Sequence, residues 1–401
     1  MSEQTNLVPK RRFKEFQNTD AWEQRKLKDF GKATGGTSIE SEFVDGGKYK
    51  VISIGSYSEQ SVYTDQNIRA ELTDKTRNRV LNKDDLTMIL NDKTASGNII
   101  GRVLLIDSND SYVYNQRTER IEPDHEKYDS QFLYQMLNAP MIRSKIIKQA
   151  QGNTQIYVNW SAIGELDYLV PNLDEQREIG AFFSNFDHLI TLHQRKLEKA
   201  KALKLAYLSE MFPAEGERVP KRRFAGFTNA WEQHTISELA DRYDNLRVPI
   251  TASDRMPGNT PYYGANGIQD YVEGFTHCGE FILVAEDGAN DLQNYPVQYV
   301  NGKVWVNNHA HVLQARSEIA DNKFLMNALK QTNIEPYLVG GGRAKLNADV
   351  MMKISLRVPE LAEQKKIGSF FERLDHLITL HQRKLEKLQN LKKAYLNEMF
   401  V

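Results

Sequence analysis

A long duplicated segment constrains this chain more than any other feature of its sequence. Val170–Phe212 returns 188 residues later as Val358–Phe400 without a gap, and Asp187–Lys199 is identical to Asp375–Lys387. A shorter repeat, VPKRRF followed by AWEQ, precedes each copy. The chain therefore consists of two halves, each with a short motif, a variable insert and a repeated long segment.

The repeated segments carry apolar residues at spacings of three and four, which predicts two long amphipathic helices. Asn172 with Glu175 predicts a capping box where the first helix begins, and Pro213 predicts where it ends. Neither helix could bury its apolar stripe alone, so we expect the two to pair in one intramolecular coiled coil. The residues expected in its seam are Leu189, Leu197, Leu377 and Leu385.

The variable inserts predict two β-rich domains closed by short helices, because runs of β-branched residues alternate with Gly, Asn and Asp turns. In the first insert we expect strands at Tyr49–Ile54, Leu86–Leu90 and Ile99–Ile106, and helices at Phe132–Leu137 and Met141–Ile147. In the second we expect strands at Phe281–Ala285 and Val304–Val306, a turn at Asn266-Gly267 and a helix at Lys323–Gln331. We divide the chain into the first motif and insert (1–160), the first long helix (161–213), the second motif and insert (214–346) and the second long helix (347–401).

Length and composition set limits on the class of protein. A chain of 401 residues can form two domains that each bury a core, and no apolar run approaches the roughly 18 residues that cross a bilayer. The single cysteine, Cys278, cannot form an internal disulfide, and the first residues contain no apolar signal segment, so we expect a cytoplasmic protein. The net charge of −1 does not decide for or against a nucleic-acid partner, because binding depends on where the charge lies.

Motifs for catalysis are missing from the sequence. Each Gly-Lys pair lacks the Ser or Thr that completes a phosphate-binding loop, and no two prolines are adjacent, which excludes the Asn/Asp-Pro-Pro-aromatic motif of amino-methyltransferases. Pro123-Asp124 is not followed by the Asp/Glu-x-Lys triplet of metal nucleases. His309 and His311 could ligate a metal from one strand face, but packing and polar contacts are the favoured interpretation. We therefore expect no catalytic residue, metal ion or cofactor on this chain.

Two repeated elements each leave a functional and a structural interpretation open. The basic triplets Lys10–Arg12 and Lys221–Arg223 could bind phosphate or the acidic face of a partner, or they could be solvated beside a hydrophobic anchor. The glycine-rich turns Gly152–Gln155 and Gly340–Arg343 could face a phosphate. They could instead give the backbone the freedom to cross from the insert to the long helix, which is the interpretation we favour.

The motifs Pro171–Gln176 and Pro359–Gln364, the identical run that begins at Asp187, and the segment Tyr262–Ile268 closely resemble the specificity (S) subunit of type I restriction-modification systems. The resemblance covers nearly the whole chain. It implies an α+β fold, with two β-rich target recognition domains that are related by pseudo-twofold symmetry and joined by two long antiparallel coiled-coil helices. It also implies a non-catalytic protein that recognises a bipartite DNA site, one half per domain.

The same resemblance implies the partners. The chain would bind double-stranded DNA, two modification (methyltransferase) subunits and restriction (endonuclease/translocase) subunits. S-adenosylmethionine, ATP and Mg²⁺ would be held only by those other subunits. Basic residues on the flanks of the helices are the candidates for partner binding, although a solvated face would have the same pattern. They are Arg195, Lys196, Lys199, Arg383, Lys384 and Lys387.

Sequence-specific recognition of DNA needs polar side chains against base edges, and affinity needs basic side chains on phosphates. The candidate DNA-binding residues are Thr37, Ser38 and Tyr57 in the first insert, Tyr263, Asn266 and Gln269 in the second, and Arg343 in the second glycine-rich turn. Tyr262 and Tyr263 could instead pack at the edge of a sheet. Gln155 takes the place that Arg343 has in the other half, so a basic role is not carried over to it.

Two other classes of function remain open. The chain could be a stand-alone nuclease, or a non-DNA binding protein with two β-rich domains on a coiled-coil stalk. A nuclease would cut DNA in the presence of Mg²⁺, and a glycan binder would show neither affinity for DNA nor a dependence on salt.

Overall fold

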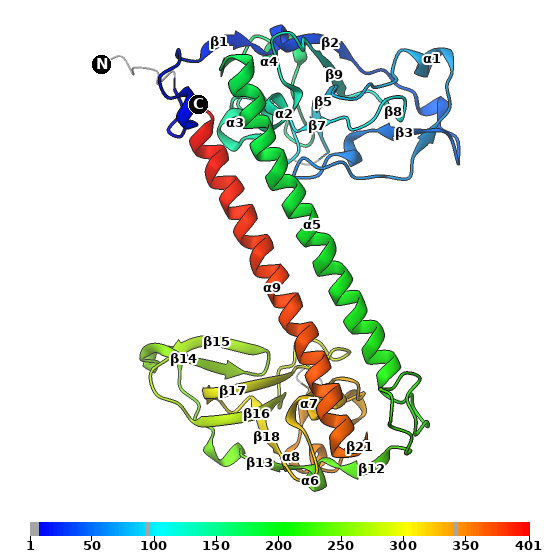
Figure 1. Ribbon diagram of the computed structural model, residues 1–401, viewed down its shortest axis with the longest axis vertical. Coiled ribbons are helices and arrows are strands. Elements are labelled where there is room, and N and C mark those ends of the chain that lie inside the picture. Colours follow the sequence, from blue (N-terminus) through cyan, green and yellow to red (C-terminus); the bar gives the residue numbers. More distant parts are fainter. Residues whose placement is uncertain (1–7, 94–95, 341–343) are drawn as a thin grey trace. The chain divides into compact units, whose positions relative to one another are not determined.

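The computed structural model describes residues 8–93, 96–340 and 344–401 (Figure 1). The chain forms two compact units. Unit 1 contains the residues up to His193 together with Lys384–Val401, and unit 2 is Gln194–Arg383. These boundaries fall inside the two long helices, α5 (Leu173–Met211) and α9 (Leu361–Met399), so each unit contains part of both.

The described residues of unit 1 form two sheets and two isolated strand pairs. Its strands are β1 (Glu23–Lys26), β2 (Gly31–Gly35), β3 (Tyr49–Ile52), β4 (Arg69–Ala70), β5 (Leu86–Ile89), β6 (Asn91–Asp92), β7 (Val103–Leu105), β8 (Tyr112–Tyr114), β9 (Thr118–Pro123), β10 (Ile156–Tyr157) and β11 (Asp167–Val170). One sheet has the order β2-β9-β5-β7 and is antiparallel. In the other, β4-β3-β8, the strands β3 and β8 are parallel. The pairs are β1–β11 and β6–β10.

The short helices of unit 1 are α1 (Asp74–Arg77), α2 (Ser130–Asn138), α3 (Pro140–Ile147) and α4 (Trp160–Ile163). Asp129 caps α2 by accepting a hydrogen bond from the Phe132 backbone N–H at 2.8 Å. Pro140 opens α3, where its missing N–H costs no hydrogen bond. The strands and helices expected in the first insert are thus confirmed, except that β7 begins only at Val103, after a turn in which Gly101 has a φ of +68°.

Unit 2 contains a six-stranded sheet with the order β13-β18-β16-β17-β14-β15. These strands are β13 (Ala240–Arg242), β14 (Pro257–Gly264), β15 (Gly267–Val272), β16 (His277–Ala285), β17 (Val297–Val306) and β18 (Ala310–Ala315). The remaining strands form the pairs β12 (Glu232–Thr235) with β21 (Ser355–Val358) and β19 (Leu338–Val339) with β20 (Lys345–Leu346). The short helices are α6 (Ile236–Leu239), α7 (Asn322–Lys330) and α8 (Ala348–Met351). The strands, the turn and the helix expected in the second insert are all present.

The long helices run antiparallel within each unit. In unit 1, Phe182 of α5 packs edge-on against Tyr395 of α9, and Lys392 donates to Asp187 at 2.5 Å. In unit 2, Tyr207 of α5 packs edge-on against Phe370 of α9. Lys204 there donates to Asp375, which repeats the ion pair of unit 1 at the duplicated positions.

The expected seam is only half right. Leu197 and Leu385 are buried, with 4% and 8% of their surface exposed, but Leu189 and Leu377 are 40% and 43% exposed. The sequence stripe also omitted Phe183 and Phe371, which are fully buried. The reason is that each helix begins against a β-rich domain, where a second face becomes buried beside the face that meets the other helix.

The last arginine of each basic triplet has a structural role, whereas the first two residues of each triplet are exposed. Arg12 makes a two-pronged salt bridge to the buried Glu175, with Nε to Oε1 at 2.7 Å and Nη2 to Oε2 at 2.6 Å. Arg223 repeats it with Glu363 at 2.8 and 2.7 Å. Such pairs fix geometry as well as charge. Neither interpretation of the triplets anticipated this contact. The capping box is corrected too: Asn172 does cap α5, accepting from the Glu175 N–H at 3.0 Å, but the Glu175 carboxylate binds Arg12 instead.

A second duplicated contact attaches α5 and α9 to the inserts. Gln176 accepts from the backbone N–H of Asp129, and Gln364 accepts from that of Asp321, at 3.0 and 3.1 Å. At Gly180 a Cβ atom would lie 2.6 Å from the Asp129 carboxylate, so only glycine allows this approach. The repeated Glu-Gln dipeptide therefore anchors each insert to its helix.

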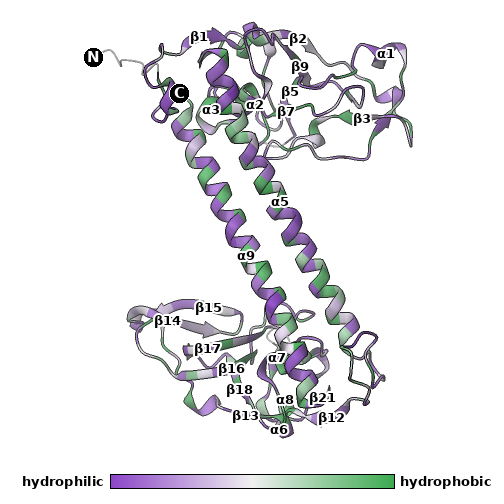
Figure 2. Cartoon of the chain, in the orientation of Figure 1, coloured by the Kyte–Doolittle hydropathy of each residue, from purple (hydrophilic) through white to green (hydrophobic). Residues whose placement is uncertain are grey.

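Figure 2 shows hydrophilic residues along both long helices, with hydrophobic residues interspersed. Among the described residues, none of the helices combines the length and the apolar character that a membrane crossing requires.

Candidate nucleic-acid interface

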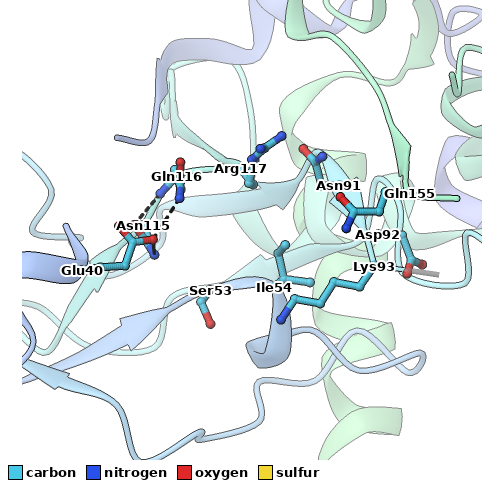
Figure 3. Close-up of a pocket in the computed structure, with 10 residues that line it drawn as sticks. All are labelled: Glu40, Ser53, Ile54, Asn91, Asp92, Lys93, Asn115, Gln116, Arg117 and Gln155. Carbon is cyan, nitrogen blue, oxygen red and sulfur yellow. Dashed lines mark hydrogen bonds between the residues drawn. The ribbon is translucent and has the colours of Figure 1, made fainter. Parts of the chain in front are cut away.

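A polar pocket of about 360 Å³ lies in unit 1, where loops follow the ends of β5 and β8 (Figure 3). Amides, charged groups and one hydroxyl provide most of its lining. The lining residues are Glu40, Ser53, Ile54, Asn91, Asp92, Lys93, Asn115, Gln116, Arg117 and Gln155. They come from five separate stretches of the chain, so only the folded insert assembles them.

The loop between β8 and β9 is braced by Asn115. Its side chain is 6% exposed, and its Oδ1 accepts from the backbone N–H groups of Ile39 at 3.1 Å and Gln116 at 2.8 Å. Its Nδ2 donates to Glu40 at 2.9 Å, and Gln116 donates to the same carboxylate oxygen at 2.9 Å (Figure 3). These hydrogen bonds hold the loop against the segment that carries Ile39 and Glu40.

Glu40 is a strong acceptor within this network. Hydrogen bonds from Ser38 and from Asn115 lower its pKa to about 2, so the carboxylate is charged throughout the physiological range. A charged carboxylate can accept from the exocyclic amino group of a base, as acidic side chains do from cytosine.

Arg117 adopts a left-handed backbone with a φ of +70°, which is uncommon outside glycine. Its carbonyl accepts from the Leu90 N–H at 2.9 Å, which holds the strained residue in place. Its side chain is exposed, as are those of Gln116, Gln155 and Lys93. A guanidinium, two amides and an ammonium thus face solvent together, which suits guanine, adenine and phosphate respectively.

Of the three candidate DNA-binding residues in the first insert, two are exposed and one is buried. Thr37 and Ser38 are exposed; Ser38 donates to Glu40, and Thr37 accepts from Arg79 at 3.3 Å. The prediction that Tyr57 contacts DNA at the surface is wrong. It is 4% exposed, it packs with Ile52 and Tyr114, and this burial raises the pKa of its hydroxyl. A tyrosine in a glycine- and serine-rich stretch resembles an exposed loop residue in sequence, but here it belongs to a core.

The candidates of the second insert converge on one end of the unit 2 sheet. Asn266 donates to the Gly288 carbonyl at 2.9 Å, and Gln269 accepts from Asn307 at 3.4 Å. Tyr263 is half-buried against the sheet, and its carbonyl accepts from the Asn307 N–H at 3.1 Å. Tyr262 is buried and hydrogen-bonded to Ile250, so it packs in the sheet, although β14 lies between β17 and β15 and not at the edge. Arg343 lies outside the described residues.

His311 belongs to a charged cluster with Asp244 and Glu286, whose ligand atoms all lie within 4.8 Å of one another. Its Nδ1 is 2.7 Å from Asp244 and its Nε2 is 2.8 Å from the Leu346 carbonyl. Arg247 donates to Glu286 at 2.6 Å. With both ring nitrogens engaged and a cation already present, the cluster is better explained as an ion-pair network than as a metal site.

The two glycine-rich turns share a backbone feature, since Gly152 and Gly340 have φ values of +95° and +97°. On the long helices, the basic residues selected for partner binding are all exposed: Arg195, Lys196, Lys199, Arg383, Lys384 and Lys387. Their exposure is required for either a partner surface or a solvated one.

Several residues of the pocket were not selected from the sequence, notably Asn91, Asn115, Gln116 and Arg117. The available signal was positional. The polar run Asn115-Gln116-Arg117 begins directly after the buried strand β8, where the chain leaves the core, and Asn91 lies two residues beyond the end of β5. Because many loops share that pattern, the sequence does not show which ones meet in space.

A family model described as type I restriction modification DNA specificity domain matches residues 19–202 and 229–390. A type I restriction enzyme specificity subunit from Haemophilus influenzae is 44% identical over 146 residues, which are 36% of this chain and 38% of that protein. The MjaVIII specificity subunit of Methanocaldococcus jannaschii is 20% identical over 349 residues, covering 79% of this chain and 78% of the relative.

Among solved structures, the S subunit of a type I restriction-modification system from M. genitalium has the same fold. The two align with a TM-score of 0.73 over 98% of this chain and 99% of that one, at 17% sequence identity. The α+β fold, with two inserts and two long helices, is thus confirmed.

Proposed function

Because the chain belongs to the family of type I restriction modification DNA specificity domains, we propose that it recognises a bipartite DNA site, one half per insert. It confers DNA sequence specificity on a type I restriction-modification system. In this proposal it acts in the cytoplasm, performs no catalysis itself and holds modification and restriction subunits. S-adenosylmethionine, ATP and Mg²⁺ bind to those subunits.

One observation supports the DNA-reading role above the others. The pocket in unit 1 gathers amides, a guanidinium and a carboxylate at the ends of rigid strands, and these are the groups that distinguish base pairs in the major groove. Its lining by polar side chains suits the edge of a base better than a small-molecule ligand, whose pocket is lined mainly by apolar side chains.

The duplicated helices support the scaffolding role. The identical runs Asp187–Lys199 and Asp375–Lys387 present the same exposed basic residues, and Leu189 and Leu377 are exposed at matching positions. Leu203 and Leu391 are a second exposed pair. Two copies of one surface fit two copies of one partner, and so support binding of two modification subunits.

The test exchanges one insert. The chain is expressed with its modification subunits, and residues 235–340 are replaced by the corresponding insert of a relative. Sequencing of methylated bases should show one half of the recognised site changed and the other half retained. The reciprocal exchange of the first insert is the matched control and should change the other half.

Changes in both halves, or in neither, would contradict the proposal. The rival functions are read from the purified chain. DNA that is cut in Mg²⁺ without other subunits would indicate a nuclease. The absence of any salt-sensitive DNA binding by the assembled complex would indicate a protein with a different ligand.

A further inference from the structure

The two inserts differ in sequence, but two loops of one insert have the same backbone arrangement as two loops of the other. In unit 1, Ile89 of β5 is paired with Thr118 of β9; in unit 2, Ala285 of β16 is paired with Ala310 of β18. The residues that follow one strand and precede the other therefore correspond. Asn91 corresponds to Asp287, and Arg117 corresponds to His309.

Backbone hydrogen bonds support this correspondence independently of the strand register. Leu90 donates to the Arg117 carbonyl, and Glu286 donates to the His309 carbonyl, both at 2.9 Å. The carbonyls of Leu90 and Glu286 in turn accept from Val158 at 2.9 Å and Leu346 at 2.7 Å. Val158 and Leu346 are related by the same 188-residue spacing as the long helices.

The loop that carries Arg117 or His309 also has the same brace in both units. Asn115 donates its N–H to the Ile52 carbonyl at 3.0 Å, and Asn307 donates to the Tyr263 carbonyl at 3.1 Å. Each of these asparagines is almost fully buried, and each accepts through Oδ1 from a following backbone N–H at 2.8 Å. The two units therefore share the same backbone hydrogen bonds around this loop and the same buried asparagine.

The side chains that these loops display are different. In unit 1, with the Asn91 amide oriented so that both of its ends are paired, its oxygen accepts from Arg117 Nη1 at 3.0 Å. In unit 2, Asp287 Oδ1 lies 2.5 Å from His309 Nδ1. At these corresponding positions, two side chains contact each other in both units. In unit 1 they are an amide and a guanidinium, and in unit 2 they are a carboxylate and an imidazole.

We propose that Asn91 with Arg117 (pair 1) and Asp287 with His309 (pair 2) determine specificity, each pair for one half of the DNA site. This inference rests on the proposed function. In pair 1 the exposed Arg117 guanidinium offers the donors that guanine accepts, and the buried Asn91 amide positions it. Pair 2 presents a carboxylate, which can accept from the amino group of cytosine.

The experiment transplants each pair into the other unit. The chain is expressed with its modification subunits in three forms besides wild type: Asn91→Asp with Arg117→His, Asp287→Asn with His309→Arg, and Arg77→His. The last is the control, because Arg77 is exposed and does not line the pocket. Methylated bases are mapped for each form, and thermal unfolding checks that each form is folded.

The first exchange should alter one or two positions of one half-site and leave the other half unchanged. The second exchange should do the same for the opposite half, and the control should mark the wild-type site. If an exchange does not fold, Arg117→Lys replaces it: loss of the planar fork should reduce discrimination at one position by roughly 10- to 100-fold.

Unchanged consensus sequences, with only weaker methylation, would overturn the pairs as specificity determinants. So would changes spread over both halves. These results would leave the proposed function standing, provided that the wild type marks a bipartite site. If the wild type marks no such site, the proposed function itself fails.

Discussion

Glu119 is a buried acid two residues beyond Arg117. It is 5% exposed, and desolvation raises its pKa to about 7, with Arg79 opposing the shift only in part. By strand register it occupies the place that His311 has in unit 2, since Met88 pairs with Glu119 and Val284 pairs with His311. Each unit therefore has a titratable side chain directly beneath its candidate reading loop.

Unit 1 should lose stability as pH rises. An unfolded Glu119 releases its proton near pH 4.5, whereas the folded one keeps it until about pH 7. The unfolded state binds fewer protons across this window, so the free energy of unfolding falls by about 3 kcal/mol between those values. Glu119→Gln should remove this dependence and raise stability at pH 8. Urea unfolding at pH 5 and pH 8 measures the free energy of unfolding, with the exposed Glu126→Gln as the control variant. The same pH dependence in both variants would contradict the role of Glu119.

The sequence predicts local residue roles better than distant ones. The cap at Asn172 was predictable because donor and acceptor are three residues apart. The role of Glu175 was not, because its partner Arg12 lies 163 residues away. The same limit applies to Asn91 and Arg117: each is recognisable as polar, but only the sheet brings them together.

Helices and strands were largely predictable from periodicity, because a repeated burial pattern needs only local sequence. The order of the six-stranded sheet in unit 2 was not, since it joins β13 to β18 and β14 to β17 across long stretches of chain. For the long helices, a single apolar stripe predicted the pairing correctly. It missed Phe183 and Phe371 because a helix with two partners has two buried faces.

Two leucines on α5 provide a matched test of this burial. Leu197→Ala should destabilise the protein by about 2 to 5 kcal/mol, because it removes a buried side chain. Leu189→Ala makes the same chemical change at a 40% exposed site and should cost less than about 1 kcal/mol. Denaturant unfolding compares the two. Equal losses would show that Leu189 is as well packed as Leu197.

The protein as a whole contains two β-rich inserts on two shared helices. Both α5 and α9 pass from one unit into the other, so a change of length must be made in both. The sequence predicted the duplication and the pairing of helices. It did not predict that the compact units divide at His193 and Arg383, inside the helices, because that division depends on contacts between distant segments.

If the helices set the distance between half-sites, lengthening both should lengthen the DNA spacer. Seven residues added between His193 and Gln194, and seven between Arg383 and Lys384, add two turns or about 11 Å. DNA rises about 3.4 Å per base pair, and each pair also rotates the second half-site by about 35°. We expect a spacer longer by one to three pairs, with both half-sites retained.

Methylation mapping checks the spacer directly. Seven residues added between Glu215 and Gly216, outside both helices, are the control and should leave the spacing unchanged. Sites that keep the original spacing in the lengthened protein would show that the helices hold partners without measuring the DNA.

Phe400 stacks on Phe183 at a centroid distance of 5.8 Å, and Met399 lies in the same core of unit 1. The ribosome makes these residues after all of unit 2. Unit 1 is therefore begun first but its core is closed last, whereas unit 2 receives Phe212 before its insert has been translated. A nascent chain therefore carries an incomplete unit 1 throughout synthesis, and a premature stop late in the message removes residues from the core that was encoded first.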